Sequence, residues 1–207
     1  MNIKKILLPA TLCLLSFNVI AADNQINKAN WIPTLDEYLK NGQYASARKI
    51  TSSEPAAAVL ERLKPWADSG LTPAQWMYAE TLLRAERNQE SADWTYIAFF
   101  NTRLDASLCN NSDALGLEQS IIKSFNRTVM SARNHPEVMT QAIINTINYQ
   151  KNQPRSFISK KKPEWICLMV VNNDKDKVTV PTSEWNSIYQ KNLDDFINKT
   201  KGKNEDE

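Results

Sequence analysis

Apolar residues recur at helical spacing along most of the chain, which predicts an all-α protein. In one segment Trp76, Ala79 and Leu83 fall at i, i+3 and i+7, with charged residues at the edges of that stripe or beyond them. The four glycines all lie near a predicted helix end or in the tail, and no long alternating run rich in Val and Ile predicts a sheet. The expected helices cover residues 34–41, 43–50, 53–63, 72–87, 88–100, 117–129, 136–149 and 182–197.

Short motifs predict where several of these helices begin and end. Thr34-Leu35-Asp36-Glu37 and Thr72-Pro73-Ala74-Gln75 both have the form of a capping box, in which side chains satisfy the free N–H groups of the first turn. Gly42 stands where the first helix would stop. Pro65 is expected to bend or break the third helix, because proline lacks a backbone donor and restricts the residue before it.

The region from Phe157 to Val180 is the least regular part of the pattern. Its apolar run WICLMVV, residues 165–171, is too short to distinguish helix from strand. We expect it to be buried core held by Cys167, and an exposed edge that binds a partner or is prone to aggregation is the alternative. The brief alternation of residues 178–180 leaves room for a small hairpin with that run. A short extended segment near 165–180 is therefore part of the prediction.

The first 22 residues have the character of a secretory signal peptide, since two lysines precede an apolar run and two alanines follow it. A membrane anchor is the alternative, but the run is shorter than the roughly 20 apolar residues of a spanning helix. We expect a signal at 1–22, a single helical domain at 23–199 and a disordered charged tail at 200–207. The protein would be periplasmic or secreted, with no membrane span after signal cleavage.

The charge of the exported chain excludes one class of partner. Loss of Lys4 and Lys5 with the signal leaves 23 basic and 23 acidic residues, so the formal net charge is zero. A neutral chain lacks the basic surface that nucleic-acid binding needs. We therefore expect no nucleic-acid partner.

Cysteine usage predicts one disulfide. Cys13 leaves with the signal, and Cys109 and Cys167 remain, separated by 58 residues. In an oxidising compartment such a pair is most simply a disulfide, and two free buried thiols are the alternative. A metal site is less favoured, because two cysteines and one distant histidine lack ligand spacing. No cofactor motif is present, so no cofactor is expected.

The search for catalytic residues favours a protein that is not an enzyme. The single histidine, His135, lies between Asn134 and Pro136 and is more simply a turn residue before a helix. Glu80 and Glu86 could supply the two carboxylates of a glycan-cleaving enzyme. Glu80 stands four residues before Arg84, however, so we expect a solvated helix face on which these two charges pair.

An internal repeat is suggested when the sequence is aligned with itself at an offset of 45 residues, because three positions then carry residues of similar type. The pattern Trp31/Tyr38/Ala47 and Trp76/Leu83/Ala92/Tyr96 resembles the tetratricopeptide class of helical-hairpin repeats over residues 30–104. The spacing exceeds that family's usual period of about 34 residues, and chance agreement in an ordinary helical bundle is the alternative. The resemblance implies a divergent bundle of hairpins that binds another protein or a peptide.

These observations together predict a bacterial, non-enzymatic binding protein. The chain combines an export signal, an aromatic-rich helical domain and one cysteine pair. In this it is similar in type to small periplasmic immunity proteins, so the function we favour is neutralisation of a toxin delivered to the periplasm. An envelope-assembly adaptor that holds peptides is the alternative, and a glycan-active enzyme is the third. The candidate partner-binding residues are Trp66, Trp94 and Trp185, according to which of them are exposed.

Overall fold

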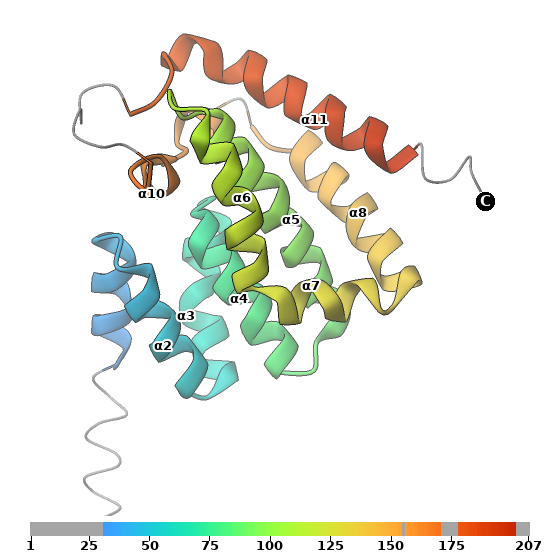
Figure 1. Ribbon diagram of the computed structural model, residues 1–207. Coiled ribbons are helices and arrows are strands. Elements are labelled where there is room, and N and C mark those ends of the chain that lie inside the picture. Colours follow the sequence, from blue (N-terminus) through green and yellow to red (C-terminus); the bar gives the residue numbers. More distant parts are fainter. Residues whose placement is uncertain (1–30, 155, 171–177, 202–207) are drawn as a thin grey trace, which may run out of the picture.

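The structure is a computed structural model that describes residues 31–154, 156–170 and 178–201. The predicted signal lies outside these residues. Within them the protein is all-α, with helices packed side by side and no strand (Figure 1). A first helix covers residues 31–40. The elements that follow are α2 (Tyr44–Ser53), α3 (Ala56–Asp68), α4 (Thr72–Arg84), α5 (Asn88–Ser107), α6 (Asp113–Ser124), α7 (Asn126–Arg133), α8 (Pro136–Lys151), α9 (Ser156–Ser159), α10 (Glu164–Cys167), the 3₁₀ helix Thr182–Glu184 and α11 (Trp185–Lys201).

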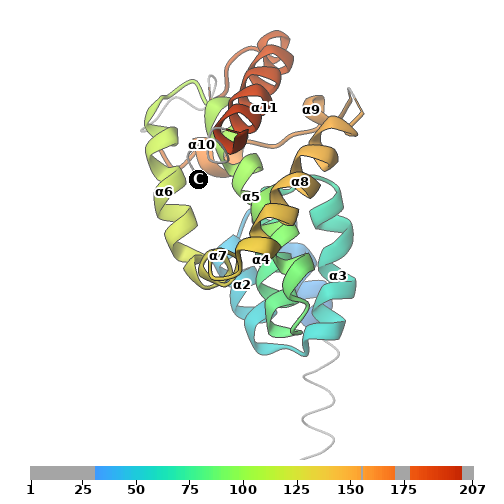
Figure 2. The same ribbon diagram turned by 90° about the vertical axis from the view of Figure 1, so that its right-hand side faces the viewer.

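Helix α5 forms the centre of the bundle. It packs against α4, α6, α7, α8, α10 and α11, and Figures 1 and 2 show these helices around it. Its buried residues, among them Ala92, Ile97, Phe100 and Leu104, are distributed around the helix and do not form one stripe. A helix that is buried on most sides is expected to lack a single apolar face. The buried ion pair and the disulfide described below both involve α5 or the residues that directly follow it.

Both predicted helical hairpins form. The helix over 31–40 turns into α2 at Gly42, whose φ of 73° is the left-handed conformation that glycine favours. Helix α4 turns into α5 at Glu86, which also has positive φ, at 59°. Trp31 and Trp76, the first residues of the two matched sets, are buried, with 8% and 0% of their surface exposed. Ala92 packs in a cluster with Ala132 and Ala142, so its small side chain lets α7 and α8 approach α5.

Several predicted helix boundaries are wrong: α5 continues to Ser107, beyond the predicted end at 100, and the single helix expected over 117–129 is two helices, α6 and α7. Three further boundaries show the cause. The first helix already includes Trp31, so Thr34 lies inside it and does not cap it. At α4 the capping position is held by Leu71, and the Thr72 hydroxyl hydrogen-bonds to Asp105 on α5. Helix α11 extends through Lys201, two residues into the predicted tail. In these places packing against other elements overrides the local motif.

Pro65 was expected to bend or break α3, and the break does not occur, because the helix continues through it to Asp68. Proline removes the hydrogen bond that would otherwise join its nitrogen to the carbonyl of Glu61. Pro65 and Glu61 both lie on the exposed side of α3, where water satisfies the freed carbonyl. On the opposite side Leu63 and Ala67 are fully buried, and their packing holds the helix together.

The apolar run at 165–171 does not behave as one buried unit. Ile166 and Cys167 are fully buried, but Leu168 and Met169 are 51% and 59% exposed. The predicted hairpin partner, residues 178–180, pairs instead with the end of α5 through an isolated bridge between Cys109 and Thr179. A four-residue helix and a turn occupy the described part of the run, so no extended segment forms there.

Gly70, in the turn before α4, is a position where a larger side chain is expected to destabilise the protein. Its φ is 84°, and a Cβ atom there would lie 2.9 Å from Cε2 of the buried Phe157 ring. We therefore expect Gly70→Ala to lower the free energy of unfolding by about 1–3 kcal/mol, measured by urea titration. Gly116 is the matched control: it lies within α6 with open space around it, so Gly116→Ala should stabilise by roughly 1 kcal/mol. Equal effects of the two changes would contradict this account.

Candidate functional site

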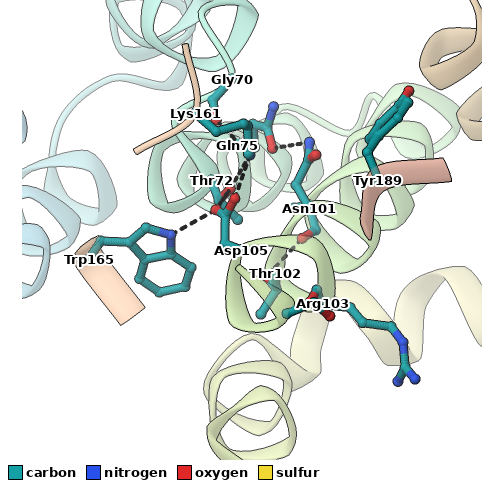
Figure 3. A network of polar contacts seen from close by, with 12 residues as sticks. Gly70, Thr72, Gln75, Asn101, Thr102, Arg103, Asp105, Lys161, Trp165 and Tyr189 are labelled. Carbon is teal, nitrogen blue, oxygen red and sulfur yellow. Dashed lines mark hydrogen bonds and ion pairs between the residues drawn. The ribbon is translucent and has the colours of Figure 1, made fainter. Parts of the chain in front are cut away.

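A buried ion pair ties the irregular segment 156–170 to the centre of the bundle (Figure 3). The Lys161 ammonium lies 2.9 Å from Oδ1 of Asp105, and both side chains are only 1% exposed. Lys161 Nζ also donates to the Gly70 carbonyl and to the Thr72 hydroxyl, each at 3.2 Å. The ammonium therefore has one ion-pair partner and two hydrogen-bond acceptors, and a buried charge is tolerated when it is paired in this way.

The Asp105 carboxylate is satisfied from two further elements. Oδ2 accepts the Thr72 hydroxyl from α4 and the indole N–H of Trp165 from α10, the latter at 2.8 Å. Next to this group, the Gln75 amide oxygen accepts a bond from Asn101 at 2.9 Å and its nitrogen donates to the Ala67 carbonyl. The network thus joins α3, α4, α5 and α10 in the interior, where an unpaired polar group would be costly.

The predicted disulfide is present and reinforces the same attachment. Cys109 follows α5 and Cys167 ends α10, with their Cα atoms 5.2 Å apart. Cys167 lies two residues after Trp165, so the covalent link and the hydrogen bond to Asp105 act on one short stretch of chain. We call residues 164–169 the braced turn.

The braced turn ends in two neighbouring exposed apolar side chains. Among the large hydrophobic residues of the described ranges, Leu168 and Met169 are the most exposed, and they are adjacent in the chain. The other exposed examples lie on separate helices and include Met130 on α7, at 41%, and Ile144 on α8, at 46%. Single exposed apolar residues are ordinary, but an adjacent pair on a firmly held turn is a candidate contact surface. Sequence reasoning favoured buried core for the whole run 165–171 and gave an exposed, partner-binding edge only as the alternative, so it did not single out this pair.

The three tryptophans predicted to contact a partner do not lie together. Trp185 is 5% exposed and packs in the core with Phe100 and Leu104, so its indole does not reach the surface. Trp94 is half-buried and makes edge-to-face contacts with Tyr78 and Tyr149, with ring centroids 5.1 and 6.0 Å apart.

Trp66 is also half-buried, and its indole nitrogen donates to Asp36 at 3.0 Å. Lys64 links the regions of Trp66 and Trp94, because it precedes Trp66 by two residues and its ammonium lies 5.7 Å from the Trp94 ring centroid. Of the three candidates, Trp66 on α3 and Trp94 on α5 are therefore the two that remain partly exposed.

The predicted pairing of Glu80 with Arg84 is wrong. Glu80 receives two bonds from Arg48 on α2, at 2.9 and 2.8 Å. Arg84 instead donates to backbone carbonyls at the end of α2, including that of Thr51 at 2.6 Å, where a cation is favoured by the helix dipole. Arg48 also lies 4.1 Å from the ring centroid of Phe125, which stacks on Trp76.

The residues considered for catalysis are either paired with another side chain or exposed in turns. Glu80 is held by Arg48, and Glu86 is an exposed residue of the α4–α5 turn. His135 is an exposed turn residue before α8, as expected, with Glu137 3.7 Å away. In the described part of the chain, no group of three or more His, Cys, Asp or Glu residues is arranged to hold a metal ion.

Glu118 is a buried acid whose pKa yields a testable pH dependence. Burial raises the pKa of this carboxyl above 4.5, and Arg103 on α5, 3.4 Å away, and Lys199 on α11 oppose the shift. A raised folded-state pKa means that charged Glu118 costs stability at neutral pH, and that this cost disappears as the pH falls through the folded pKa to 4.5. We expect Glu118→Gln to be more stable than the parent at pH 7, with the difference shrinking toward pH 4.5 in urea unfolding. A difference that does not change with pH would contradict the assignment.

Comparison with protein-family models, with curated proteins and with solved structures finds no match. The structure itself defines the class: an all-α protein of packed helices with one disulfide. Among the helices described, none is both long and apolar enough to cross a membrane.

Proposed function

We propose that this is an exported, non-enzymatic protein that binds another protein, and that it neutralises a toxin delivered to the bacterial periplasm. The observation that carries the proposal is the braced turn: Leu168 and Met169 are exposed beside a disulfide and a buried ion pair. A contact surface already held in its bound shape loses little conformational entropy on association, which improves affinity. Methionine suits such a surface because its unbranched side chain adapts to a partner.

Export is supported by the disulfide and by the signal-like first 22 residues. Disulfides persist in oxidising compartments such as the periplasm, and Cys109–Cys167 is such a bond. The hairpins over 31–104, which resemble tetratricopeptide repeats, supply a rigid helical scaffold for the turn. An inhibitor would act by occlusion, with Leu168 and Met169 inserted into an apolar part of the toxin's active-site cleft.

Site-specific cross-linking tests the proposal in living cells. With p-benzoyl-L-phenylalanine in place of Met169, irradiation should join the protein to one partner. The same amino acid in place of Met130, a methionine of similar exposure on α7, is the matched control and should give no such product. No product at position 169, or the same products at both positions, would reject the braced turn as the binding surface.

The identity of the cross-linked partner then distinguishes toxin neutralisation from the role of an envelope-assembly adaptor. A toxin is expected to lose its activity when mixed with one equivalent of this protein. The double change Leu168→Ser and Met169→Ser should weaken that inhibition about 30-fold, the value for loss of an anchor worth about 2 kcal/mol. A partner that is an envelope component and keeps its activity would establish the adaptor version instead.

A further inference from the structure

A hollow of about 520 Å³ lies between the first helix and α3, on a part of the surface that shares no residue with the braced turn. Its size falls within the range of small-molecule sites. We call it the Trp66 hollow. The first helix contributes Asp36, Glu37 and Lys40, the turn after it contributes Asn41, and α3 contributes Arg62, Pro65 and Trp66.

The indole of Trp66 is held in place at this hollow. Its N–H donates to Oδ1 of Asp36 at 3.0 Å, and Arg62 Nε donates to the same oxygen at 2.8 Å. A second Arg62 nitrogen pairs with the other oxygen of Asp36, so the carboxylate is fixed by two side chains. Leu63, about one turn before Trp66, and Ala67, directly after it, are fully buried and anchor this part of α3. The hollow therefore presents a pre-oriented aromatic ring that keeps part of its surface exposed.

Pro65, the proline inside α3, lies at the same hollow. An interior proline costs a helix about 3 kcal/mol, because a hydrogen bond is lost and the ring clashes with the preceding turn. Pro65 lines the Trp66 hollow, where its ring adds a second rigid apolar surface beside the indole. Costly local structure of this kind is found preferentially at functional positions.

The lining selects for the chemistry of a ligand. Five of the seven side chains are ionised or carry an amide, and their charges balance, since Asp36 and Glu37 oppose Lys40 and Arg62. A strongly anionic ligand would meet two carboxylates, and an apolar peptide would cover Glu37, Lys40 and Asn41 without offering them hydrogen bonds. A neutral molecule with many hydroxyls fits better, because each hydroxyl both donates to carboxylates and accepts from Lys, Arg and Asn. Its apolar face would cover the ring of Trp66.

We propose that the Trp66 hollow binds a neutral saccharide, with the C–H face of one sugar ring stacked on Trp66 and with its hydroxyls bonded to Glu37, Lys40 and Asn41. This activity does not depend on the proposed toxin neutralisation, which uses the braced turn. Since the hollow is shallow and open at the surface, affinity for a short oligosaccharide should be modest, with a Kd on the order of 1 mM.

Nuclear magnetic resonance of the tryptophan indole N–H groups tests the proposal. The probes are tri-N-acetylchitotriose and cellotriose, two neutral oligosaccharides that differ in their N-acetyl groups. We expect at least one of them to shift the Trp66 indole signal saturably. The signals of Trp76 and Trp185, whose indole N–H groups are bonded inside the bundle, should not move.

Two variants complete the experiment. Trp66→Phe keeps an apolar ring but has a smaller stacking face and loses the bond to Asp36, so it should weaken binding about tenfold or more. Binding in this variant is followed by the backbone amide signals of residues 36–41. Trp94→Phe, on α5 and outside the lining of the hollow, is the control and should bind as the parent does. The proposal is overturned if neither sugar gives a saturable shift at about twenty times the expected Kd, or if Trp66→Phe binds unchanged.

Discussion

Lys161→Met is expected to lower the free energy of unfolding by about 3–5 kcal/mol, because it leaves the Asp105 carboxylate buried without its counter-charge. Both groups are 1% exposed, so water does not replace the lost partner. Urea unfolding followed by circular dichroism measures the change. Lys162, the next residue, is exposed, and Lys162→Met should change stability by less than about 0.5 kcal/mol. Similar losses for the two lysines would contradict the assignment.

A double-mutant cycle isolates the interaction itself. Asp105→Asn keeps an acceptor for the indole of Trp165 but leaves the Lys161 ammonium without a carboxylate. The combined variant Lys161→Met/Asp105→Asn should lose less than the sum of the two single changes, because it contains no unpaired buried charge. Strict additivity would show that the two side chains act independently.

Removal of the disulfide is expected to have an effect of similar size. Cys109 and Cys167 close a separation of 58 residues, which corresponds to about 4 kcal/mol if the bond acts by restricting the unfolded chain. We expect the pair of changes Cys109→Ala and Cys167→Ala to lower the free energy of unfolding by roughly that amount. The parent protein measured under reducing conditions should approach the variant. An oxidised parent no more stable than the variant would show that the bond contributes nothing.

The same variant has a local consequence that a general loss of stability does not explain. Because the disulfide holds the braced turn on α5, backbone amides at Cys167 and Leu168 should exchange with solvent before those of α4 and α5 do. Hydrogen exchange measured well below the unfolding midpoint tests this. Uniform acceleration across the whole chain would indicate that the turn and the bundle open together.

Most of the secondary structure was predictable, because helical periodicity is a local property of the sequence. The hairpin turn at Gly42, the start of α8 at Pro136 and the disulfide followed from short motifs and residue types. The local motifs failed where a side chain found a partner in another element. The Thr72 hydroxyl bonds to Asp105, which lies 33 residues away, and Glu80 pairs with Arg48 at a separation of 32.

The candidate site was less predictable than the fold. Residues 160–162 are three consecutive lysines, and no local pattern indicates that the middle one is buried while both neighbours are exposed. The run at 165–171 is equally uniform in sequence, yet Ile166 is fully buried and Met169 is 59% exposed. Of the residues that line the hollow between the first helix and α3, only Trp66 was predicted from the sequence as a contact residue.

The sequence by itself determined that the chain forms helices and where most of them lie, and it favoured a disulfide between Cys109 and Cys167 over two free thiols. Those properties depend on the spacing of apolar residues over a few turns and on the number of cysteines. The tertiary structure decided which charges are buried and which apolar side chains reach the surface. Lys161 meets Thr72 across 89 residues of chain, and such a contact exists only after α4, α5 and the segment before α10 have packed together.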